Sequence, residues 1–218
     1  MARLEKARVV VVGVGGVGSW CAEALVRTGV GHVTLVDDDA VVPSNVNRQC
    51  PATSRTMGCA KVEAMRERLL EIRPDCEVAA VKARYEGGGD VLRSPDGTAV
   101  DLVVDAIDSV DCKAELILSA TGAGVPIVSS MGAALRTDPT RVAVRRFDKV
   151  EGDGLARALR QRFKRLARHP QSKFSCVCSD EPPRKAEDRA VKGSLMPVTC
   201  AFGMALAAEA LKILSPHD

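Results

Sequence analysis

Two cations in the first third of the chain stand where phosphate chemistry would need them. Arg48 lies in Ser44–Gln49 (Ser-Asn-Val-Asn-Arg-Gln), a stretch rich in hydrogen-bond donors, and its guanidinium can hold two phosphate oxygens at once. Lys61 falls in the first turn of a predicted helix, where the helix dipole disfavours a cation unless an anion is bound nearby. Both residues indicate contact with a phosphate group, although an Asn-rich turn also forms for local backbone reasons.

Acidic residues follow two predicted strands, at the edge where ligands bind in open α/β sheets. Asp37 closes one strand and comes nineteen residues after Gly18, the spacing at which a dinucleotide fold places an acid on the ribose. Two further aspartates follow it, and we expect one of the three acids to be structural or solvated. Asp105 and Asp108 end another strand, and one or both can hold magnesium through oxygen ligands.

These side chains need a loop that can carry phosphates, and a glycine-rich turn supplies it. Its glycines are Gly13, Gly15, Gly16 and Gly18. They stand between a β-branched strand over 9–12 and a helix over 19–27, which is the setting that a nucleotide-binding loop requires. Glycines let the backbone approach a phosphate, and the helix N-terminus offers free N–H groups. A turn used only for close strand–helix packing is the alternative, and the loop alone does not identify the nucleotide.

The order of the remaining elements predicts the fold class. Further strands are expected over 33–36, 78–81, 100–105 and 125–129, and further helices over 58–72 and 111–122. This alternation predicts a Rossmann-like, doubly wound, mostly parallel sheet. Segments 133–137 and 141–147 flank the turn Asp138-Pro-Thr140 and are predicted to extend the sheet as an antiparallel pair.

We expect a single domain over 1–218, made of a nucleotide-binding half (1–131) and a second half (132–218). The second half is predicted to hold the antiparallel strands, a basic helix over 154–168, a mobile loop over 169–196 and a C-terminal core helix over 198–214. The last helix is apolar enough to resemble a membrane span, but it contains Glu209 and Lys212, which favours a core helix.

The helix over 154–168 has a strongly basic face. Its candidate nucleic-acid-binding residues are Arg157, Arg160, Lys164, Arg165 and Arg168. No acidic residue lies between Leu155 and Asp180, and a stripe of one sign suits a phosphate backbone. A solvated helix face is the simpler alternative.

Composition restricts the class of protein. The formal net charge of +3 is too small to identify a partner, and hydrophobic residues at 46% are sufficient for a core. The eight cysteines include no C-x-x-C pair, which argues against a structural zinc site. With no signal peptide at the start of the sequence, we expect reduced thiols and a cytoplasmic protein.

Together these motifs resemble the adenylating enzymes related to ubiquitin-activating enzyme, the ThiF and MoeB superfamily. The resemblance covers residues 8–113 and rests on Gly13-x-Gly-Gly-x-Gly18, Asp37-x-Asp39, Ser44-Asn-x-Asn-Arg-Gln49, Lys61 and Asp105-x-x-Asp108. Within the superfamily, the chain is most similar to the tRNA threonylcarbamoyladenosine dehydratases. The features that carry this are Asn45-Val-Asn-Arg-Gln, Lys113, Ser129-Ser-Met-Gly132, Asp138-Pro-Thr140 and Ser179-Asp-Glu-Pro-Pro183. Enzymes that activate sulfur-carrier proteins usually bear two C-x-x-C pairs, which this sequence lacks.

The resemblance implies a fold, an activity and a set of site residues. It implies ATP over the glycine loop with Asp37 on the ribose, Arg48 and Lys61 as catalytic residues on the phosphates, and Asp108 as a catalytic residue that holds magnesium. The implied nucleotide-binding residues are Gly13, Gly15, Gly16, Gly18, Asp37, Asp39, Asn45, Asn47, Arg48, Gln49, Lys61, Asp108 and Ser109. The reaction would be adenylation of the threonylcarbamoyladenosine carboxylate in tRNA, followed by cyclisation, in a homodimer that binds tRNA through the basic helix.

Several alternatives stay open at this stage. Adenylation of the C-terminus of a ubiquitin-like sulfur carrier is the second candidate, with a sulfur-transfer protein as a further partner. Family members usually carry an arginine ahead of the first strand that reaches the partner subunit's ATP, whereas only Met1–Lys6 precede it here. Either Arg3 or Arg8 takes that role, or the start is truncated, or the protein is slow or inactive. A nucleotide-dependent scaffold and a nicotinamide dehydrogenase complete the alternatives, and Cys176 and Cys178 are weak candidates for sulfur relay.

Overall fold

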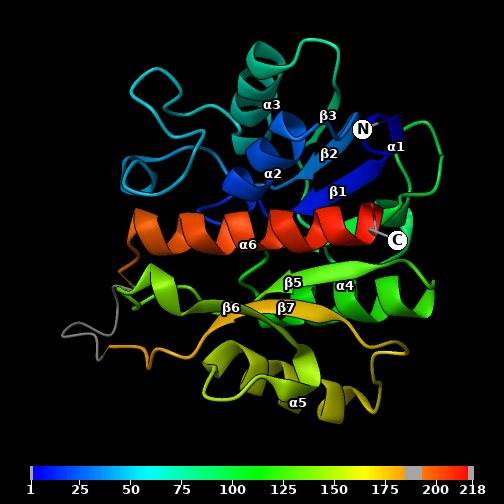
Figure 1. Ribbon diagram of the computed structural model, residues 1–218, viewed down its shortest axis with the longest axis vertical. Coiled ribbons are helices and arrows are strands. Elements are labelled where there is room, and N and C mark those ends of the chain that lie inside the picture. Colours follow the sequence, from blue (N-terminus) through cyan, green and yellow to red (C-terminus); the bar gives the residue numbers. More distant parts are fainter. Residues whose placement is uncertain (1, 185–192, 216–218) are drawn as a thin grey trace.

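The computed structural model describes residues 2–184 and 193–215, and its centre is a seven-stranded sheet (Figure 1). The strands are β1 (Arg8–Val12), β2 (His32–Val36), β3 (Glu77–Val81), β4 (Leu102–Asp105), β5 (Ile127–Ser130), β6 (Val142–Arg146) and β7 (Ser175–Ser179). Their order across the sheet is β3-β2-β1-β4-β5-β7-β6, and all neighbours are parallel except β6 and β7. The predicted Rossmann-like class with an antiparallel extension is confirmed.

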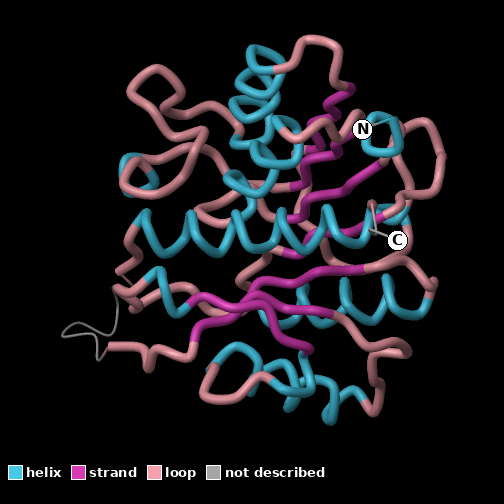
Figure 2. The backbone as a smooth tube through the Cα atoms, viewed as in Figure 1, coloured by secondary structure: helices cyan, strands magenta, loops and turns pink. Residues whose placement is uncertain are grey.

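Helices cover both faces of this sheet (Figure 2). They are α1 (Ala2–Glu5), α2 (Gly18–Arg27), α3 (Lys61–Ile72), α4 (Val110–Gly122), α5 (Gly154–Leu166) and α6 (Met196–Leu214), with short 3-10 helices η1 (Pro43–Asn45), η2 (Asp90–Leu92), η3 (Pro139–Arg141) and η4 (Phe147–Lys149). Alternate valines of β1 point to opposite sides, so Val9 and Val11 pack with α2, α3 and α6, whereas Val10 and Val12 pack with α4 and α5. The β-branched run is thus buried on both faces, as a central parallel strand requires.

The second half of the sheet differs from the prediction. Residues 133–137 form no strand, and β6 pairs instead with β7 in antiparallel register. β7 also pairs in parallel with β5, so it fills the place between β5 and β6 within the segment predicted as a mobile loop. Its sequence, Ser-Cys-Val-Cys-Ser, has neither a β-branched run nor an alternation of polar and apolar residues, so it carries no strand signal. Four of its five residues are nevertheless buried, and their small side chains fit between the neighbouring elements. Part of the predicted loop, residues 185–192, lies outside the described residues.

Helix α6 runs along one face of the sheet beside α2 (Figure 1). The two helices meet at Gly203, where an added Cβ would lie 2.7 Å from the carbonyl oxygen of Val17. Phe202 and Leu206 on its inner side are fully buried, which is the placement predicted for a core helix. Among the described helices, α6 is the one that is long and apolar enough to cross a membrane on length and composition alone.

The register of the central strands brings the candidate residues to one edge. Val12 of β1 lies beside Val36 of β2 and Asp105 of β4, so the loops that leave these strands start at the same level. Strand order reverses between β1 and β4, because the chain continues toward β3 on one side and toward β5 on the other. In open α/β sheets, ligands bind at this switch point.

Candidate active site

The glycine loop is closely packed against the loop that follows β4. Gly13 has a φ of +92°, a conformation that favours glycine, and an added Cβ would lie 2.6 Å from the carbonyl oxygen of Ala106. A Cβ on Gly18 would collide with the carbonyl of Gly13. On Gly16, a Cβ would lie 3.2 Å from Cγ of Arg48, so the arginine side chain rests directly against the loop. The loop and Arg48 therefore form one continuous surface at the N-terminus of α2.

Asp37 connects the end of β2 to this loop. Its Oδ2 accepts a hydrogen bond from the Val14 backbone N–H at 2.7 Å, and its Oδ1 accepts one from the Asp39 N–H at 2.9 Å. Burial raises the pKa of the Asp37 carboxyl above its usual value, although these two hydrogen bonds oppose the shift. The predicted ribose ligand is thus also a structural support of the glycine loop.

Lys61 lies at the same edge, where its charge is held by Asp39. It is the first residue of α3, which begins at Lys61 rather than at the predicted Gly58. Its Nζ lies 2.5 Å from Oδ2 of Asp39, and its side chain is only 7% exposed, against 64% for Asp39. The anion that the sequence required near this lysine is therefore present in the chain itself. Lys61 is oriented before any phosphate arrives.

The Ser44–Gln49 loop is shaped largely by its own side chains. The Nη1 of Arg48 donates to the Ser44 carbonyl at 2.8 Å and to Oδ1 of Asn47 at 2.9 Å. Asn47 donates to the carbonyl of Ser194, at the start of α6, and the buried Asn45 accepts from the Val42 N–H at 3.3 Å. Both asparagines therefore support the loop conformation, and the nucleotide contacts predicted for them from the sequence stay a prediction.

Gln49 is the residue of this loop that points into the site. It is buried, and its Nε2 lies 3.8 Å from the position that a Cβ on Gly15 would occupy. Its Oε1 has no hydrogen-bond partner among the described residues. A buried amide oxygen without a partner is costly, and a bound ligand would remove that cost. This oxygen and the glycine cradle both fit a nucleotide.

Asp105, the last residue of β4, and Asp108, three residues further on, have different environments, and the prediction that one or both hold magnesium stays a prediction. Asp105 is fully buried, and its Oδ2 lies 2.8 Å from Nζ of the equally buried Lys113 and accepts from Oγ of Ser129 at 2.6 Å. Its Oδ1 accepts from the Ile107 N–H at 3.2 Å, so it fixes the loop that leads to Asp108. Asp108 is exposed, with no hydrogen bond to another described residue, and Ser109 precedes α4 as its N-cap.

These environments decide which acid fits a divalent cation. Oxygens of Asp37, Asp38 and Asp39 come within 4.8 Å of one another, but Asp37 already accepts two backbone N–H groups and Asp39 binds Lys61. The carboxylate of Asp108 is exposed and, like that of Asp38, accepts no hydrogen bond from a described residue, so its oxygens are available to magnesium, a hard cation that prefers oxygen ligands. Arg8, by contrast, lies at the amino end of β1 and pairs with Asp96 at 3.2 Å, away from this edge.

The basic helix α5 carries two kinds of arginine. Arg160 turns inward, where its Nη2 donates to the carbonyls of Phe147 and Val150 and its guanidinium lies 5.1 Å from the Phe147 ring centroid. This arginine is therefore part of the packing, although the sequence placed it in the nucleic-acid-binding set. Arg157, Lys164 and Arg165 are exposed and form no ion pair with the described residues.

Two arginines near the C-terminal end of α5 have acidic partners outside the helix, which the local sequence did not indicate. Arg162 pairs with Asp111 at 2.9 Å and Arg168 pairs with Glu115 at 3.0 Å, and both acids belong to α4. These contacts join helices that are far apart in the sequence, so the local charge pattern did not predict them. The free positive charge of α5 is correspondingly confined to part of its face.

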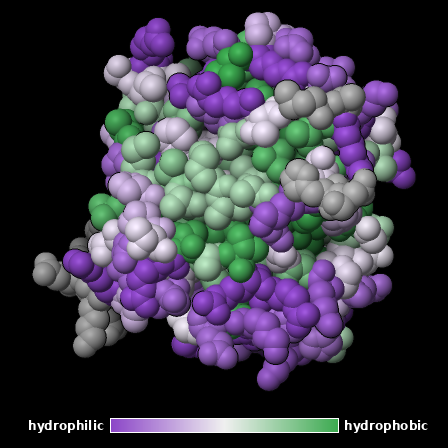
Figure 3. Space-filling view, viewed as in Figure 1, coloured by the Kyte–Doolittle hydropathy of each residue, from purple (hydrophilic) through white to green (hydrophobic). Residues whose placement is uncertain are grey.

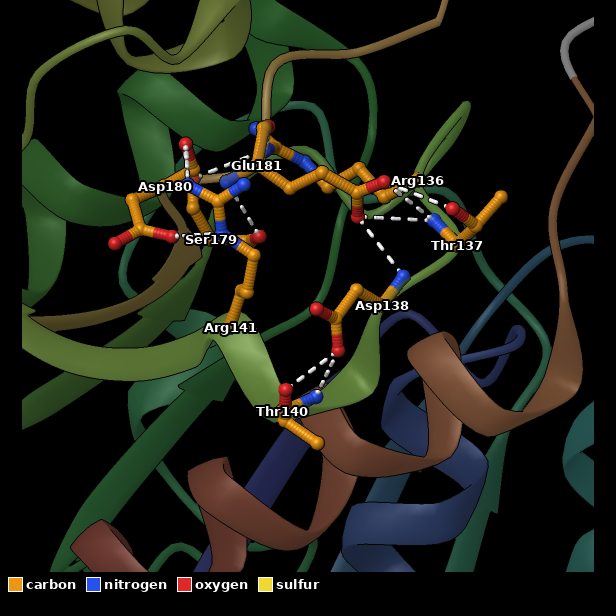
Figure 4. Close-up of polar contacts among 8 residues, drawn as sticks. All are labelled: Arg136, Thr137, Asp138, Thr140, Arg141, Ser179, Asp180 and Glu181. Atoms are coloured by element: carbon orange, nitrogen blue, oxygen red, sulfur yellow. Dashed lines mark hydrogen bonds and ion pairs between the residues drawn. The ribbon is translucent and has the colours of Figure 1, made fainter.

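Residues 136–141 and 179–181, which include two of the motifs that carry the family resemblance, form one polar network (Figure 4). The side chain of Glu181 accepts from the backbone N–H groups of Thr137 and Asp138 at 2.9 and 3.0 Å. Arg136 is nearly buried and donates to the carbonyls of Ser179 and Glu181. It also pairs with Asp153 at 3.0 Å, and Asp153 caps α5 by accepting from the Ala156 N–H. The network thus joins the loop after β5, the end of β7 and the start of α5.

Cys176 and Cys178 are also placed differently from the prediction. Both lie in β7 and are buried, whereas the sequence placed them in a flexible region. Burial raises the pKa of both thiols, and the neighbouring Cys178 adds to the effect at Cys176. A buried, protonated thiol is a poor nucleophile, so neither residue suits sulfur relay or thioester formation.

Comparison with known proteins defines the class to which this fold and site belong. The ThiF family model matches residues 1–218, and the chain therefore belongs to the ThiF family. Its relatives include a Bacillus subtilis tRNA threonylcarbamoyladenosine dehydratase, 39% identical over 180 residues, which cover 83% of this chain and 69% of that protein.

Solved structures agree with this placement. The Escherichia coli tRNA N6-threonylcarbamoyladenosine dehydratase in complex with ATP is 38% identical, with a TM-score of 0.86 over 97% of this chain and 86% of that one. The same enzyme in complex with AMP gives a TM-score of 0.87 over 97% and 87% of the two chains. The family predicted from the sequence motifs is thereby confirmed.

Proposed function

We propose that this protein catalyses the ATP-dependent cyclisation of threonylcarbamoyladenosine in tRNA, through adenylation of its carboxylate. The observation that carries the proposal is the edge formed by the glycine loop, Arg48, Lys61 and Asp108, on a chain that matches an ATP-bound relative over 97% of its length. The named relatives act on this modified nucleoside, and the site has the charges that such a reaction needs.

The first step would activate the carboxylate. ATP would lie over the glycine loop, with its phosphates near the N-terminus of α2 and its ribose near Asp37. The carboxylate of the nucleoside attacks the α-phosphorus, an O–P bond forms and pyrophosphate leaves. Arg48 and Lys61 offset the negative charge that builds up, and both are already oriented by contacts within the chain. Magnesium held by Asp108 would supply further neutralisation of the phosphate charge.

The second step would close the ring. The carbamoyl group of the same nucleoside attacks the activated carbonyl carbon and releases its proton to solvent, and AMP leaves with one carboxylate oxygen. The nucleoside thereby loses the elements of one water. Intramolecular attack at a held carbonyl gains up to about 7–11 kcal/mol from proximity, so no protein nucleophile is needed. The buried cysteines of β7 fit this scheme because it uses none.

The polyanionic substrate would bind along α5. Arg157, Lys164 and Arg165 offer exposed charges that can contact successive phosphates. Arg168 is exposed but paired with Glu115, so it would contribute less than these three residues. Arg160 donates to the Phe147 carbonyl and would make no contact with tRNA. A cytoplasmic location, where tRNA is found, belongs to this proposal.

A homodimer is also part of the proposal. Helix α6 has an apolar band on its outer side, visible at the centre of Figure 3. The large apolar side chains that α6 and its N-cap expose are Leu195, Met196 and Met204, at 48%, 43% and 41%. An apolar patch of this kind on a soluble enzyme favours an interface between subunits.

The decisive experiment follows the mass of the nucleoside. Purified protein, magnesium-ATP and tRNA carrying threonylcarbamoyladenosine should give a product lighter by one water, and Arg48→Ala and Lys61→Ala should form this product much more slowly. An unchanged mass, with the Escherichia coli enzyme active in parallel, would reject the proposal. Pyrophosphate exchange that needs a small protein ending in Gly-Gly would point instead to a sulfur-carrier substrate.

A further inference from the structure

The first turn of α2 holds the Arg48 loop by its backbone. Trp20 Nε1 donates to the carbonyl of Arg48 at 2.9 Å. Ser19 Oγ accepts from the Cys50 N–H at 3.2 Å and itself donates to the Gly15 carbonyl at 2.6 Å. The glycine loop and the Arg48 loop are therefore joined through one helix, although they are separated in the sequence.

Glu23, one turn further along α2, completes this attachment. Its Oε2 accepts from the thiol of Cys50 at 3.0 Å and from Nε of Arg68 on α3 at 2.6 Å. Its Oε1 accepts from Nε of Arg27 at 2.8 Å. Glu23 is only 7% exposed, so this carboxylate is a nearly buried junction between α2, α3 and the Arg48 loop.

The ionisation of this junction is well defined. Burial alone would raise the pKa of Glu23, but hydrogen bonds from Arg68, Cys50 and Arg27 bring the pKa down to about 2. Burial, together with the bond to Glu23, raises the pKa of the Cys50 thiol to about 12. Glu23 therefore stays an acceptor and Cys50 stays a donor throughout the working range of an enzyme.

A buried charge of this kind is weak evidence for stability, because well-packed apolar residues usually serve a core as well or better. Its partners point to another role. Cys50 directly follows Arg48 and Gln49, the two residues that rest against the glycine loop. An arginine that contacts a transferring phosphoryl group must be placed accurately, since a misplacement of about 1 Å costs about 100-fold in rate.

We infer that Glu23 is a positioning residue: through Cys50, it holds Arg48 and Gln49 against the glycine loop for adenylation. The inference rests on the proposed function only for the identity of the reaction. It assigns to Glu23 no contact with substrate.

The test uses Glu23→Gln, with Glu67→Gln as the matched control. Glu67 is an exposed acid on α3, so its change removes the same charge without touching the junction. For Glu23→Gln, we expect kcat to fall about 10- to 100-fold, while the KM for tRNA stays unchanged. We expect Glu67→Gln to behave like the wild type in both respects.

The only tryptophan of the sequence gives a second readout. Trp20 donates to the Arg48 carbonyl, so its fluorescence reports the position of the loop. In Glu23→Gln, the emission should move to longer wavelength, because a displaced loop admits water to the indole. A merely structural loss at a distance from the loop would not move this signal in the folded protein.

Each outcome has a defined meaning. Wild-type emission together with wild-type kcat in folded Glu23→Gln overturns the inference. If that variant does not fold, Cys50→Ala, which removes only the loop's own bond to Glu23, decides by the same two measurements. If the wild type forms no cyclised product, the proposed function fails. Trp20 emission and the Kd of ATP, compared between Glu23→Gln and the wild type, then still test Glu23. If both measurements are unchanged in the variant, the assigned role of Glu23 is overturned.

Discussion

The carboxyl edge of the sheet and the outer face of α5 both carry cations, but they hold them differently. At the edge, Lys61 is bound to Asp39 and Lys113 is buried against Asp105. On α5, Arg157 and Lys164 extend into solvent with no ion pair among the described residues. Fixed cations suit a transition state, whose charge develops at one place, whereas free cations suit a polyanion that presents many equivalent phosphates.

The largest effect is expected where the fixed charge is most deeply buried. Lys113→Met should lower the free energy of unfolding by about 3–5 kcal/mol, because it leaves the Asp105 carboxylate without its cation in the core. Denaturant unfolding measures this. Lys212→Met on α6, where the lysine is exposed beside Glu209, is the control and should change the value by less than about 0.5 kcal/mol. Equal effects would show that burial of the Lys113–Asp105 pair adds nothing to the cost of removing its cation.

Lys61→Ala should act on the reaction while leaving the fold intact. We expect kcat to fall about 10²- to 10³-fold, because the variant loses a preoriented charge that the proposed function assigns to the phosphates of ATP. The measurement is single-turnover formation of the cyclised nucleoside at saturating ATP. Asp39→Asn is informative beside it, since it frees Lys61 but keeps its charge. If freeing the lysine has no effect on kcat, orientation by Asp39 is irrelevant to catalysis.

The free cations of α5 should affect binding and its dependence on salt. The triple variant Arg157→Gln/Lys164→Gln/Arg165→Gln should bind tRNA with a weaker dependence on salt. The magnitude of the slope of log affinity against log salt concentration should fall by about 1 for each phosphate that the variant no longer neutralises. Filter binding over a salt series measures this. Lys6→Gln, at an exposed position between α1 and β1 and outside α5, should leave the slope unchanged.

Arg160→Gln provides a contrast within the same helix. Its guanidinium is bound to two backbone carbonyls, so its replacement should lower Tm while the salt slope stays the same. If Arg160→Gln changes the slope as much as Arg157→Gln does, the two kinds of arginine are not distinct.

The smallest effect concerns a fixed anion. Hydrogen bonds to its carboxylate hold the pKa of Glu181 below its ordinary value of 4.5. The bond from the Asp138 backbone N–H has the largest effect, and that from the Thr137 backbone N–H adds to it. A carboxyl group whose pKa is lowered by folding stabilises the folded state at pH values above 4.5. This stabilisation is lost as the pH falls below 4.5. Glu181→Gln should therefore lower Tm slightly near neutral pH, and the difference should shrink in acid. A difference that grows in acid would contradict this sign.

The sequence predicted well those parts of the fold that depend on local pattern. The valine run of β1, the glycine loop and the helical spacing in α3 and α4 are each visible within a short window. The family motifs then predicted which loops would meet at one edge. The parallel register of β1 with β2 and β4 confirms that meeting.

The errors share a physical cause, which is that the deciding partner lies elsewhere in the chain. The sequence did not distinguish Asp105 from Asp108, because the partners of Asp105, which are Lys113 and Ser129, lie on the following helix and the next strand. Strand β7 could not be recognised from Ser-Cys-Val-Cys-Ser, because β5 and β6 define it by enclosing it on both sides. Arg160 looked like part of a basic face until the carbonyls that follow β6 were placed beneath it.

The crossing of α2 and α6 at Gly203 has a consequence for how this sequence can vary. The backbone of α6 approaches Val17, which lies between two glycines of the nucleotide loop, with no side chain to act as a spacer. A single extra methyl group at residue 203 would have to displace either the long helix or the loop itself. Position 203 is thus one of the least tolerant in the chain, although it lies outside every motif that identifies the family.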